Sequence, residues 1–268
     1  MVVLLTSICC LYALNAIASS DKSSESNKDI ESQAYRFFQV GAAIKTYTSL
    51  FSTTDTYTTE LEVLKIRVGV KWENGIFANF GSFGTRGNGV GYNFYDYGDW
   101  EFDALVHSGI NAIEVGSEPF IDDFRFGLRA THYSDDSFFR IIASPINISE
   151  GTEGVYVGSW YVKSWQIKNW NIHGLTGASY FSSDILDDRY SGIFLRQTTA
   201  SETPTIEVYN PGNGVVLEFE VGATYALSRN WIFEASAGQT VVSDAIFDNP
   251  LVDNRGQTYA NLGVFYVF

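Results

Sequence analysis

Residues 215–227 read VVLEFEVGATYAL, and their side chains alternate between two kinds. The odd-numbered positions are apolar throughout, from Val215 to Leu227, whereas the even-numbered positions include Glu218, Glu220 and Thr224. The same alternation continues through residues 231–240 and 260–268. Successive side chains of a β-strand point to opposite faces, so this period of two predicts three strands that each have one apolar and one polar face.

Long strands with these two faces are typical of a transmembrane β-barrel, which has lipid outside and a polar lumen inside, and each strand needs about 9–11 tilted residues to cross the bilayer. Aromatic residues make up 16% of the chain and charged residues only 18%, as expected if aromatic side chains form girdles at the membrane interfaces. Further strand-like segments occur at residues 38–44, 64–72, 100–107, 124–131, 138–148, 155–167, 170–181 and 190–196. We therefore predict an all-β fold, a single antiparallel transmembrane β-barrel of about 12 strands and outer-membrane type, formed by residues 35–268.

Two features interrupt the regular pattern. Residues 76–97 contain so many glycines that their facing is unclear, and we expect a bulge or bend there. Pro145 lies inside a strand-like segment. Because proline cannot donate a backbone hydrogen bond, we expect Pro145 to mark the end of a strand.

The amino-terminal residues predict export from the cytoplasm. Residues 1–18 are uncharged and mostly apolar and end in an A-x-A pattern, so we predict a signal peptide cleaved after Ala18. Its start lacks basic residues, which suggests that the natural start lies upstream of Met1. Both cysteines, Cys9 and Cys10, lie in this segment, and Ile8 before Cys9 does not fit a lipoprotein signal. Residues 19–34 are polar and are expected to form a disordered periplasmic leader.

Ten charged residues are predicted to face the lumen. They are Lys65, Arg67, Lys71, Glu101, Asp103, Arg125, Arg129, Glu218, Glu220 and Glu234. They would either form salt bridges that hold the barrel shut, the interpretation we favour, or line a selective pore or ligand site. We expect Glu101 and Asp103 to lie beside Arg125 and Arg129, and the three remaining glutamates to face Arg196, Lys45 or water.

Other chemistries find little support in the sequence. The histidines, His107, His132 and His173, are far apart, and only His132 has a serine nearby, Ser134, so we expect no catalytic residues. Acidic pairs at residues 122–123, 135–136 and 187–188 could bind Ca²⁺, but aspartate is common in turns, so we expect no metal and no cofactor. A net charge of −14 argues against a nucleic-acid partner.

Four tryptophans could form a sugar-binding platform or part of an interface girdle, and we expect the girdle. They are Trp160, Trp165, Trp170 and Trp231.

The carboxy-terminal part of the chain resembles the MipA/OmpV family of MltA-interacting outer-membrane proteins. The resemblance rests on an acidic turn before a Y-x-G-hydrophobic strand at residues 183–194, Tyr-Asn-Pro at 209–211, Trp231, and DNPLVDNR at 248–255. In looser form it extends over residues 37–268. The first loop departs from the family, because it has TTDTY at residues 53–57 where the family has a proline-containing stretch.

This resemblance implies a non-enzymatic scaffold of the outer membrane that links a lytic murein transglycosylase with a bifunctional penicillin-binding protein in peptidoglycan assembly. The contacts would lie on the periplasmic turns and the leader, and the surroundings would be outer-membrane lipid and lipopolysaccharide. The resemblance also implies that Tyr266 and Phe268, in the closing strand, are read by the barrel-assembly machinery. The alternative is a small-solute pore or a surface-loop adhesin, which would use the lumen charges or the loops at residues 198–214 and 243–257.

Overall fold

The computed structural model describes residues 35–50, 57–80, 88–108, 114–115, 118–119, 124–148, 154–190, 192–196, 205–250 and 252–268. The expected signal peptide, with its cleavage site at Ala18, and the expected leader at residues 19–34 lie outside these described residues.

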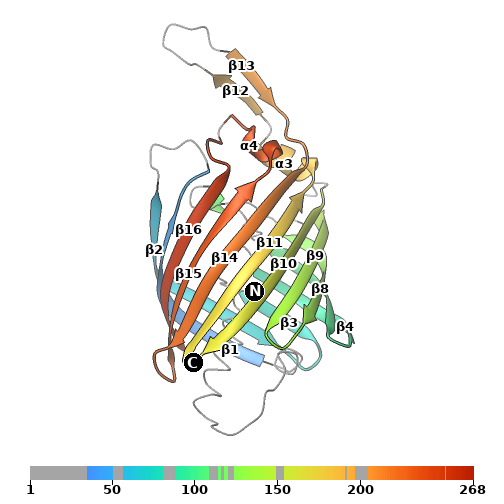
Figure 1. Ribbon diagram of the computed structural model, residues 1–268. Coiled ribbons are helices and arrows are strands. Elements are labelled where there is room, and N and C mark those ends of the chain that lie inside the picture. The colour runs from blue at the N-terminus through green and yellow to red at the C-terminus, as the bar shows by residue number, and fades with distance from the viewer. Residues whose placement is uncertain are drawn as a thin grey trace.

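Twelve antiparallel strands form a closed barrel (Figure 1), as predicted. In order around the wall they are β1 (Tyr35–Tyr47), β16 (Gly256–Val267), β15 (Trp231–Val242), β14 (Gly214–Ala226), β11 (Trp170–Phe181), β10 (Tyr156–Ile167), β9 (Ser137–Asn147), β8 (Arg125–Tyr133), β5 (Trp100–Ser108), β4 (Asn88–Tyr97), β3 (Ile76–Phe80) and β2 (Thr58–Lys71). Successive wall strands along the chain are neighbours in the wall. The exception is the seam, where β1 meets β16.

Exposure alternates along the wall strands in the way the sequence predicts. In β14, Phe219 and Val221 are 49% and 64% exposed on the outside, whereas Glu218 and Glu220 are buried on the inside. The outer face therefore has the apolar surface that lipid requires, and the polar side chains are turned toward the lumen.

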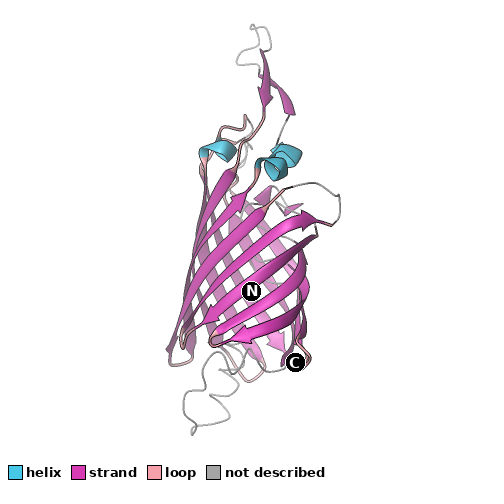
Figure 2. Cartoon of the chain, turned by 90° about the vertical axis from the view of Figure 1, so that its right-hand side faces the viewer, coloured by secondary structure: helices cyan, strands magenta, loops and turns pink. Residues whose placement is uncertain are grey.

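The two ends of the barrel differ. Short turns join the strands at the end that holds Phe268, and we call it the turn end. The opposite loop end carries the helices α3 (Ser183–Tyr190) and α4 (Asp244–Phe247) and the hairpin of β12 (Gly192–Arg196) and β13 (Thr205–Tyr209), which projects beyond the wall (Figure 2). A second two-stranded sheet joins β6 (Glu114–Val115) to β7 (Glu118–Pro119). In outer-membrane barrels the short turns lie on the periplasmic side.

None of the helices in the described part of the chain is long and apolar enough to cross a membrane.

The segment at residues 190–196 was expected to follow the β10–β11 hairpin as a short strand. The structure ends α3 at Tyr190 and starts the strand β12 only at Gly192. β12 pairs with β13 and not with the wall. The glycine-rich residues 76–97 instead supply two wall strands, β3 and β4, and the expected irregularity is a bulge in β4 between Asn93 and Tyr95.

Pro145 does not mark the end of a strand, so this prediction was wrong. β9 continues to Asn147, and its pairing with β8 shifts register between Phe126 and Leu128, opposite Pro145. A bulge leaves one residue of a strand without a ladder partner. A proline, which has no N–H to donate, can therefore lie within the strand at this point.

Aromatic side chains gather at the turn end of the outer face. Trp165, Trp170 and Trp231 are each at least 40% exposed and lie near the last or first residue of their strands. The rings of Trp170 and Tyr225 are 4.7 Å apart, and those of Trp231 and Tyr266 are 5.3 Å apart. These three tryptophans have the position of an interface girdle.

A charge on the outer face should be costly near the middle of the wall. Val221 pairs with Gly174 and Ala237 and is well exposed to lipid, so Val221→Arg should destabilise the barrel by about 2–4 kcal/mol. Ser236→Ala, on the inner face, removes one hydrogen bond from Asn261 and should cost about 1 kcal/mol. Denaturant unfolding in lipid vesicles would measure both, and equal losses would mean that the two faces are assigned the wrong way round.

The sequence alone ranks Gly222→Ser with such mild inner-face changes, and the structure corrects this. A Cβ on Gly222 would come within 2.5 Å of both Cε1 and Nε2 of His173. The His173 ring lies against this glycine, so a serine here would displace it.

The closing strand should be indispensable for insertion. Tyr266 pairs with Val40, the Phe268 amide donates to the Phe38 carbonyl, and the Phe268 ring lies 5.0 Å from the Phe38 ring. Deleting residues 266–268 removes these contacts and leaves backbone groups without partners in lipid. We expect loss of heat-modifiable migration on gels, whereas deletion of residues 21–27 should preserve it. Normal migration of the carboxy-terminal deletion would show that the barrel closes elsewhere.

Candidate functional site

The lumen contains most of the buried charge of the barrel. Of the ten charged residues expected there, eight are buried, and Lys65 and Arg129 are partly exposed. They fall into three groups, which lie at the seam, on the β2–β8 side and on the β14–β16 side.

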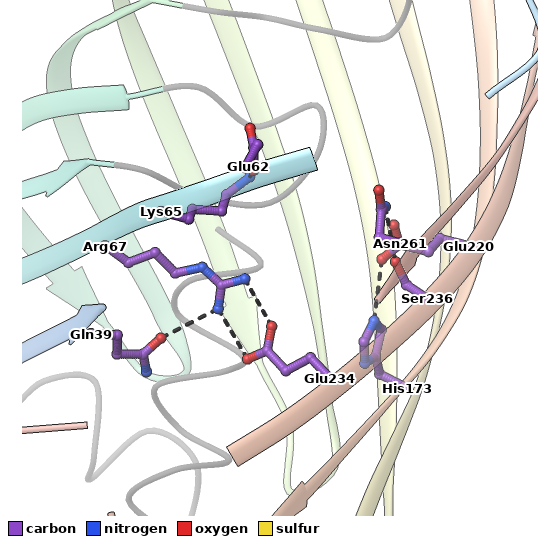
Figure 3. Close-up of polar contacts among 9 residues, drawn as sticks. All are labelled: Gln39, Glu62, Lys65, Arg67, His173, Glu220, Glu234, Ser236 and Asn261. Atoms are coloured by element: carbon purple, nitrogen blue, oxygen red, sulfur yellow. Dashed lines mark hydrogen bonds and ion pairs between the residues drawn. The ribbon is translucent and has the colours of Figure 1, made fainter. Parts of the chain in front are cut away.

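The first group lies at the seam (Figure 3). Arg67 of β2 forms a two-pronged ion pair with Glu234 of β15, with nitrogen–oxygen distances of 3.0 and 2.8 Å. The guanidinium also donates to the Gln39 side chain at 3.3 Å and lies 3.7 Å above the Phe265 ring. The charge pair is therefore held by hydrogen bonds and by a cation–π contact in a buried position. Nearby, Lys65 donates to Glu62 of its own strand.

The second group connects strands on the β2–β8 side. Lys71 reaches across β3 and β4 to Glu101 at 2.6 Å, and Glu101 also accepts a hydrogen bond from Tyr133. Arg129 pairs with Asp103 at 2.7 Å. We expected Glu101 and Asp103 to lie beside Arg125 and Arg129. The Arg129–Asp103 pair has this arrangement, but the ion-pair partner of Glu101 is Lys71.

Arg125 and Arg129 make further contacts of different kinds. Arg125 donates to the carbonyl oxygen of Gly154 at 3.1 Å. The Arg129 guanidinium lies 4.7 Å from the centre of the Phe77 ring. The arginines therefore fill the lumen by contact with backbone and rings as well as with carboxylates.

The third group surrounds Glu218 and Glu220 of β14. The Tyr259 hydroxyl lies 2.9 Å from a Glu220 oxygen and 3.5 Å from a Glu218 oxygen. His173 lies 3.2 Å from the other Glu220 oxygen, and the Trp160 indole N–H donates to Glu218 at 3.2 Å. Hydrogen-bonding side chains from three other strands thus hold both carboxylates.

The expectation that the three glutamates face Arg196, Lys45 or water was wrong for Glu234, whose partner is Arg67. Arg196 belongs to β12, which is not part of the wall. The pairing of Arg67 with Glu234 crosses two intervening strands, and alternation within one strand gives no sign of it.

Trp160 is not part of the girdle, which corrects the sequence-based prediction. It is buried in the lumen. A Cβ on Gly158 or Gly177 would come within 2.3 Å of its ring atoms, so both glycines make room for the indole. The register of β10 could have shown this, because Trp160 falls on the opposite face from Tyr161 and Trp165.

The structure brings together a histidine and a serine that sequence reasoning did not connect. His107 Nε2 lies 2.6 Å from Ser144 Oγ. Such a pair is the minimum for a nucleophile and its base. However, Ser144 has 0% exposure, so a substrate cannot reach its hydroxyl in this conformation. His132, the histidine with a serine nearby in the chain, packs instead against the Trp100 ring at 5.0 Å.

The acidic pairs considered as Ca²⁺ sites are only partly covered by the described residues. Asp136 pairs with Lys163 at 3.1 Å, and residues 122–123 lie outside the described residues. In the part of the chain that the structure describes, no group of three or more His, Cys, Asp or Glu side chains is arranged to hold a metal ion.

Apolar side chains cover the lumen at the loop end. They come from both helices and from the connections beside them, and they pack with inward side chains of the wall in one cluster. These covering residues are Leu50, Ile185, Leu186, Ile246 and Val252. The amide of Asp253 donates to the carbonyl of Leu50 at 2.9 Å, which ties two of the connections together.

Tyr209 links the projecting hairpin to this cover. Its hydroxyl donates to the carbonyl of Ala245 in α4. Burial raises the pKa of the Tyr209 phenol, and Asp248 and Asp187 nearby raise it further, so the hydroxyl keeps the proton that it donates.

Comparison with known protein families gives a match along nearly the whole barrel. The family described as MltA-interacting protein MipA matches residues 40–268. The chain belongs to the MipA family. No protein of curated function matches it significantly.

The chain also matches solved structures at low sequence identity. A KdgM porin is 14% identical, with a TM-score of 0.39, over 85% of this chain and 99% of that chain. A NanC porin is 12% identical, with a TM-score of 0.44, over 85% and 98%. The outer membrane channel DcaP of Acinetobacter baumannii is 9% identical, with a TM-score of 0.39, over 89% and 98%.

Buried ion pairs in this MipA-family barrel should contribute more to its stability than exposed ion pairs. Arg129→Ala would leave Asp103, which has 0% exposure, without its charged partner, and should cost about 3–5 kcal/mol. Lys163→Ala breaks the exposed pair with Asp136 and should cost less than about 1 kcal/mol. Denaturant unfolding in detergent micelles would compare the two variants. A small loss in Arg129→Ala would show that water, not arginine, solvates Asp103.

Proposed function

We propose that this MipA-family protein is a non-enzymatic scaffold in the outer membrane that binds a lytic murein transglycosylase on its periplasmic side and brings it together with a penicillin-binding protein. The observation that carries the proposal is the lumen, whose charged side chains contact one another or neighbouring polar groups of the wall. Family membership supports the choice of partner, because the family is described by its interaction with the protein MltA.

The contents of the lumen favour a closed barrel over a pore. The ion pairs Arg67–Glu234 and Lys71–Glu101 each reach across two intervening strands and so extend into the interior. Buried rings of Phe77, Trp160 and Phe265 occupy further inner positions, and the apolar cover lies over the loop end. A solute would have to separate buried, paired charges in order to pass, which costs several kcal/mol per ion.

The turn end offers the surface for a periplasmic partner. Its connections are short and held by backbone hydrogen bonds, as in the turn where Gly75 donates to the Trp72 carbonyl and the turn where Leu227 donates to the Trp231 carbonyl. Arg229 and Lys168 are exposed in two of these turns. A rigid surface of this kind binds a partner without ordering flexible loops first.

Recordings in planar bilayers separate the scaffold from the small-solute pore. Purified protein should give no stepwise current above the membrane baseline, because paired charges block the lumen. A porin reconstituted in the same way serves as the positive control. Regular current steps from the folded, heat-modifiable protein would support the pore and contradict the closed lumen.

Site-specific crosslinking tests the partner and its location. A photo-crosslinking residue at Asn169 or Arg229, in the turns, should capture an enzyme that cleaves glycan strands from intact envelopes. The same residue at Asn210 or Asp253, which are exposed at the loop end, is the matched control. Capture of that enzyme from the loop end, or from neither end, would contradict the proposal.

One observation favours a second function, a surface adhesin. The β12–β13 hairpin projects beyond the loop end and is joined to the cover through Tyr209 (Figures 1 and 2). Crosslinks from Asn210 to an external ligand, together with none from the turn end, would favour this alternative.

A further inference from the structure

The seam between β1 and β16 lacks the feature that sets register elsewhere in the wall. Five of the eleven other joints in the wall are turns of two to four residues, and in hairpins the turn fixes which residues oppose one another. β1 and β16 lie at opposite ends of the sequence, so no turn aligns them, although the pairing runs from Gln39 opposite Val267 to Tyr47 opposite Tyr259.

Facing alone cannot select this register. A slip by one residue would turn apolar side chains into the lumen, but a slip by two restores the facing. The outward residues next to the seam are apolar on both strands, for example Val40 and Ile44 of β1 and Leu262 and Val264 of β16. The lipid-facing surface would therefore look the same after a slip of two.

The inner face does distinguish these registers. A Cβ on Gly41 of β1 would come within 2.5 Å of the Phe265 ring, and a Cβ on Gly263 of β16 would come within 2.6 Å of the same ring. These two glycines, one on each side of the seam, form a shallow trough in which the ring lies. A slip by two residues in either direction moves one strand by about 6.7 Å, so that Gly41 no longer lies opposite Phe265 as it does in the native register.

The ion pair above the Phe265 ring also depends on the register of the seam. Arg67 belongs to β2 and Glu234 to β15, the two strands that flank the seam. Their ion pair therefore spans both seam strands, β1 and β16 (Figure 3). The two parallel nitrogen–oxygen contacts, at 3.0 and 2.8 Å, need the guanidinium and the carboxylate in one plane. Gln39 of β1 holds the guanidinium from the seam itself.

We propose that Arg67, Gln39, Phe265 and Glu234 form a clasp that selects the register in which β1 and β16 close the barrel. The clasp forms only when the seam is in its native register, because its four members come from four consecutive strands. It makes closure specific, and this role does not depend on what the barrel binds or whether it conducts.

Loop-end contacts offer a competing explanation. Thr48 and Thr258 exchange hydrogen bonds across the seam, and Asn254 donates to the Ser49 carbonyl at 3.0 Å. These contacts involve neutral groups near the loops, whereas the clasp is buried and charged. Both could align the strands, so an experiment has to compare them.

Disulfide trapping in the full-length protein reads the register directly. Cys9 and Cys10 are replaced by serine, and cysteine pairs are introduced on the outer face. Ile44→Cys with Leu262→Cys reports the native register, whereas Ile44→Cys with Val264→Cys or Ala260→Cys reports slips by two. Directly opposed residues of an antiparallel pair are about 4.5–5.5 Å apart at Cα, within disulfide range.

Glu234→Gln removes one charge of the clasp and keeps its shape. In the folded, heat-modifiable fraction we expect the ratio of slipped to native crosslinks to rise at least about ten-fold, which corresponds to about 1.4 kcal/mol. Asp103→Asn removes a buried carboxylate from the Arg129 pair, away from the seam, and should leave the ratio unchanged. Arg67→Lys keeps the positive charge but cannot make both contacts with the Glu234 carboxylate, so it should raise the ratio by a smaller factor. This variant replaces Glu234→Gln in the test if Glu234→Gln does not fold.

An unchanged ratio in the clasp variants would overturn the proposal. An equal rise in Asp103→Asn would overturn it as well, because it would trace the slip to general instability. A rise in Asn254→Ala without one in the clasp variants would assign the register to the loop end.

Discussion

A chain that crosses a bilayer in β-strands has to pair every backbone N–H and C=O group, because lipid offers no partner for them. A closed wall is the only sheet that meets this requirement, and the whole structure depends on closing it. Eleven of the joints in the wall connect strands that follow one another, and the twelfth, between β1 and β16, connects the two ends of the barrel. Near the middle of the seam the outer residues of both strands are apolar, so they do not distinguish registers that differ by two residues.

On the inner face of the barrel, several glycines leave room for the rings of neighbouring side chains. Phe265 lies over Gly41 and Gly263, Trp160 over Gly158 and Gly177, and His173 over Gly222. Rings that lie on glycine pack close to the wall and contact the charged side chains above them, as Phe265 does for Arg67. The many glycines of the chain are therefore part of the packing of the lumen as well as of its turns.

The fold could be predicted from the sequence because facing is a local property. Alternation around Val221 and Glu220 already shows which side meets lipid, and the strand number follows from repeating such segments. Contacts across the lumen could not be predicted in this way. Arg67 and Glu234 are separated by 167 residues, and His107 and Ser144 by 37. Whether such residues meet depends on the tilt of the strands and the register of every joint between them, and no single strand records these quantities.

The sequence-based predictions that were wrong also concern pairing and register between strands. Residues 190–196 have the residue types of a strand, but the position of that strand, outside the wall, is decided by its pairing with β13. Pro145 is compatible with a strand interior only because β8 and β9 shift register beside it. Trp160 was grouped with the girdle by residue type, although its register in β10 places it on the other face.

The arrangement of apolar cover and buried ion pairs has a consequence for the cell. A wide barrel normally adds leakage to a membrane with each copy that is inserted. In the proposed scaffold, the cover at the loop end and the paired charges below it take up the interior, so copies of the protein would add periplasmic surface without adding a path for ions. The amount of such a scaffold would then follow the need for its binding surface and leave the permeability of the envelope unchanged.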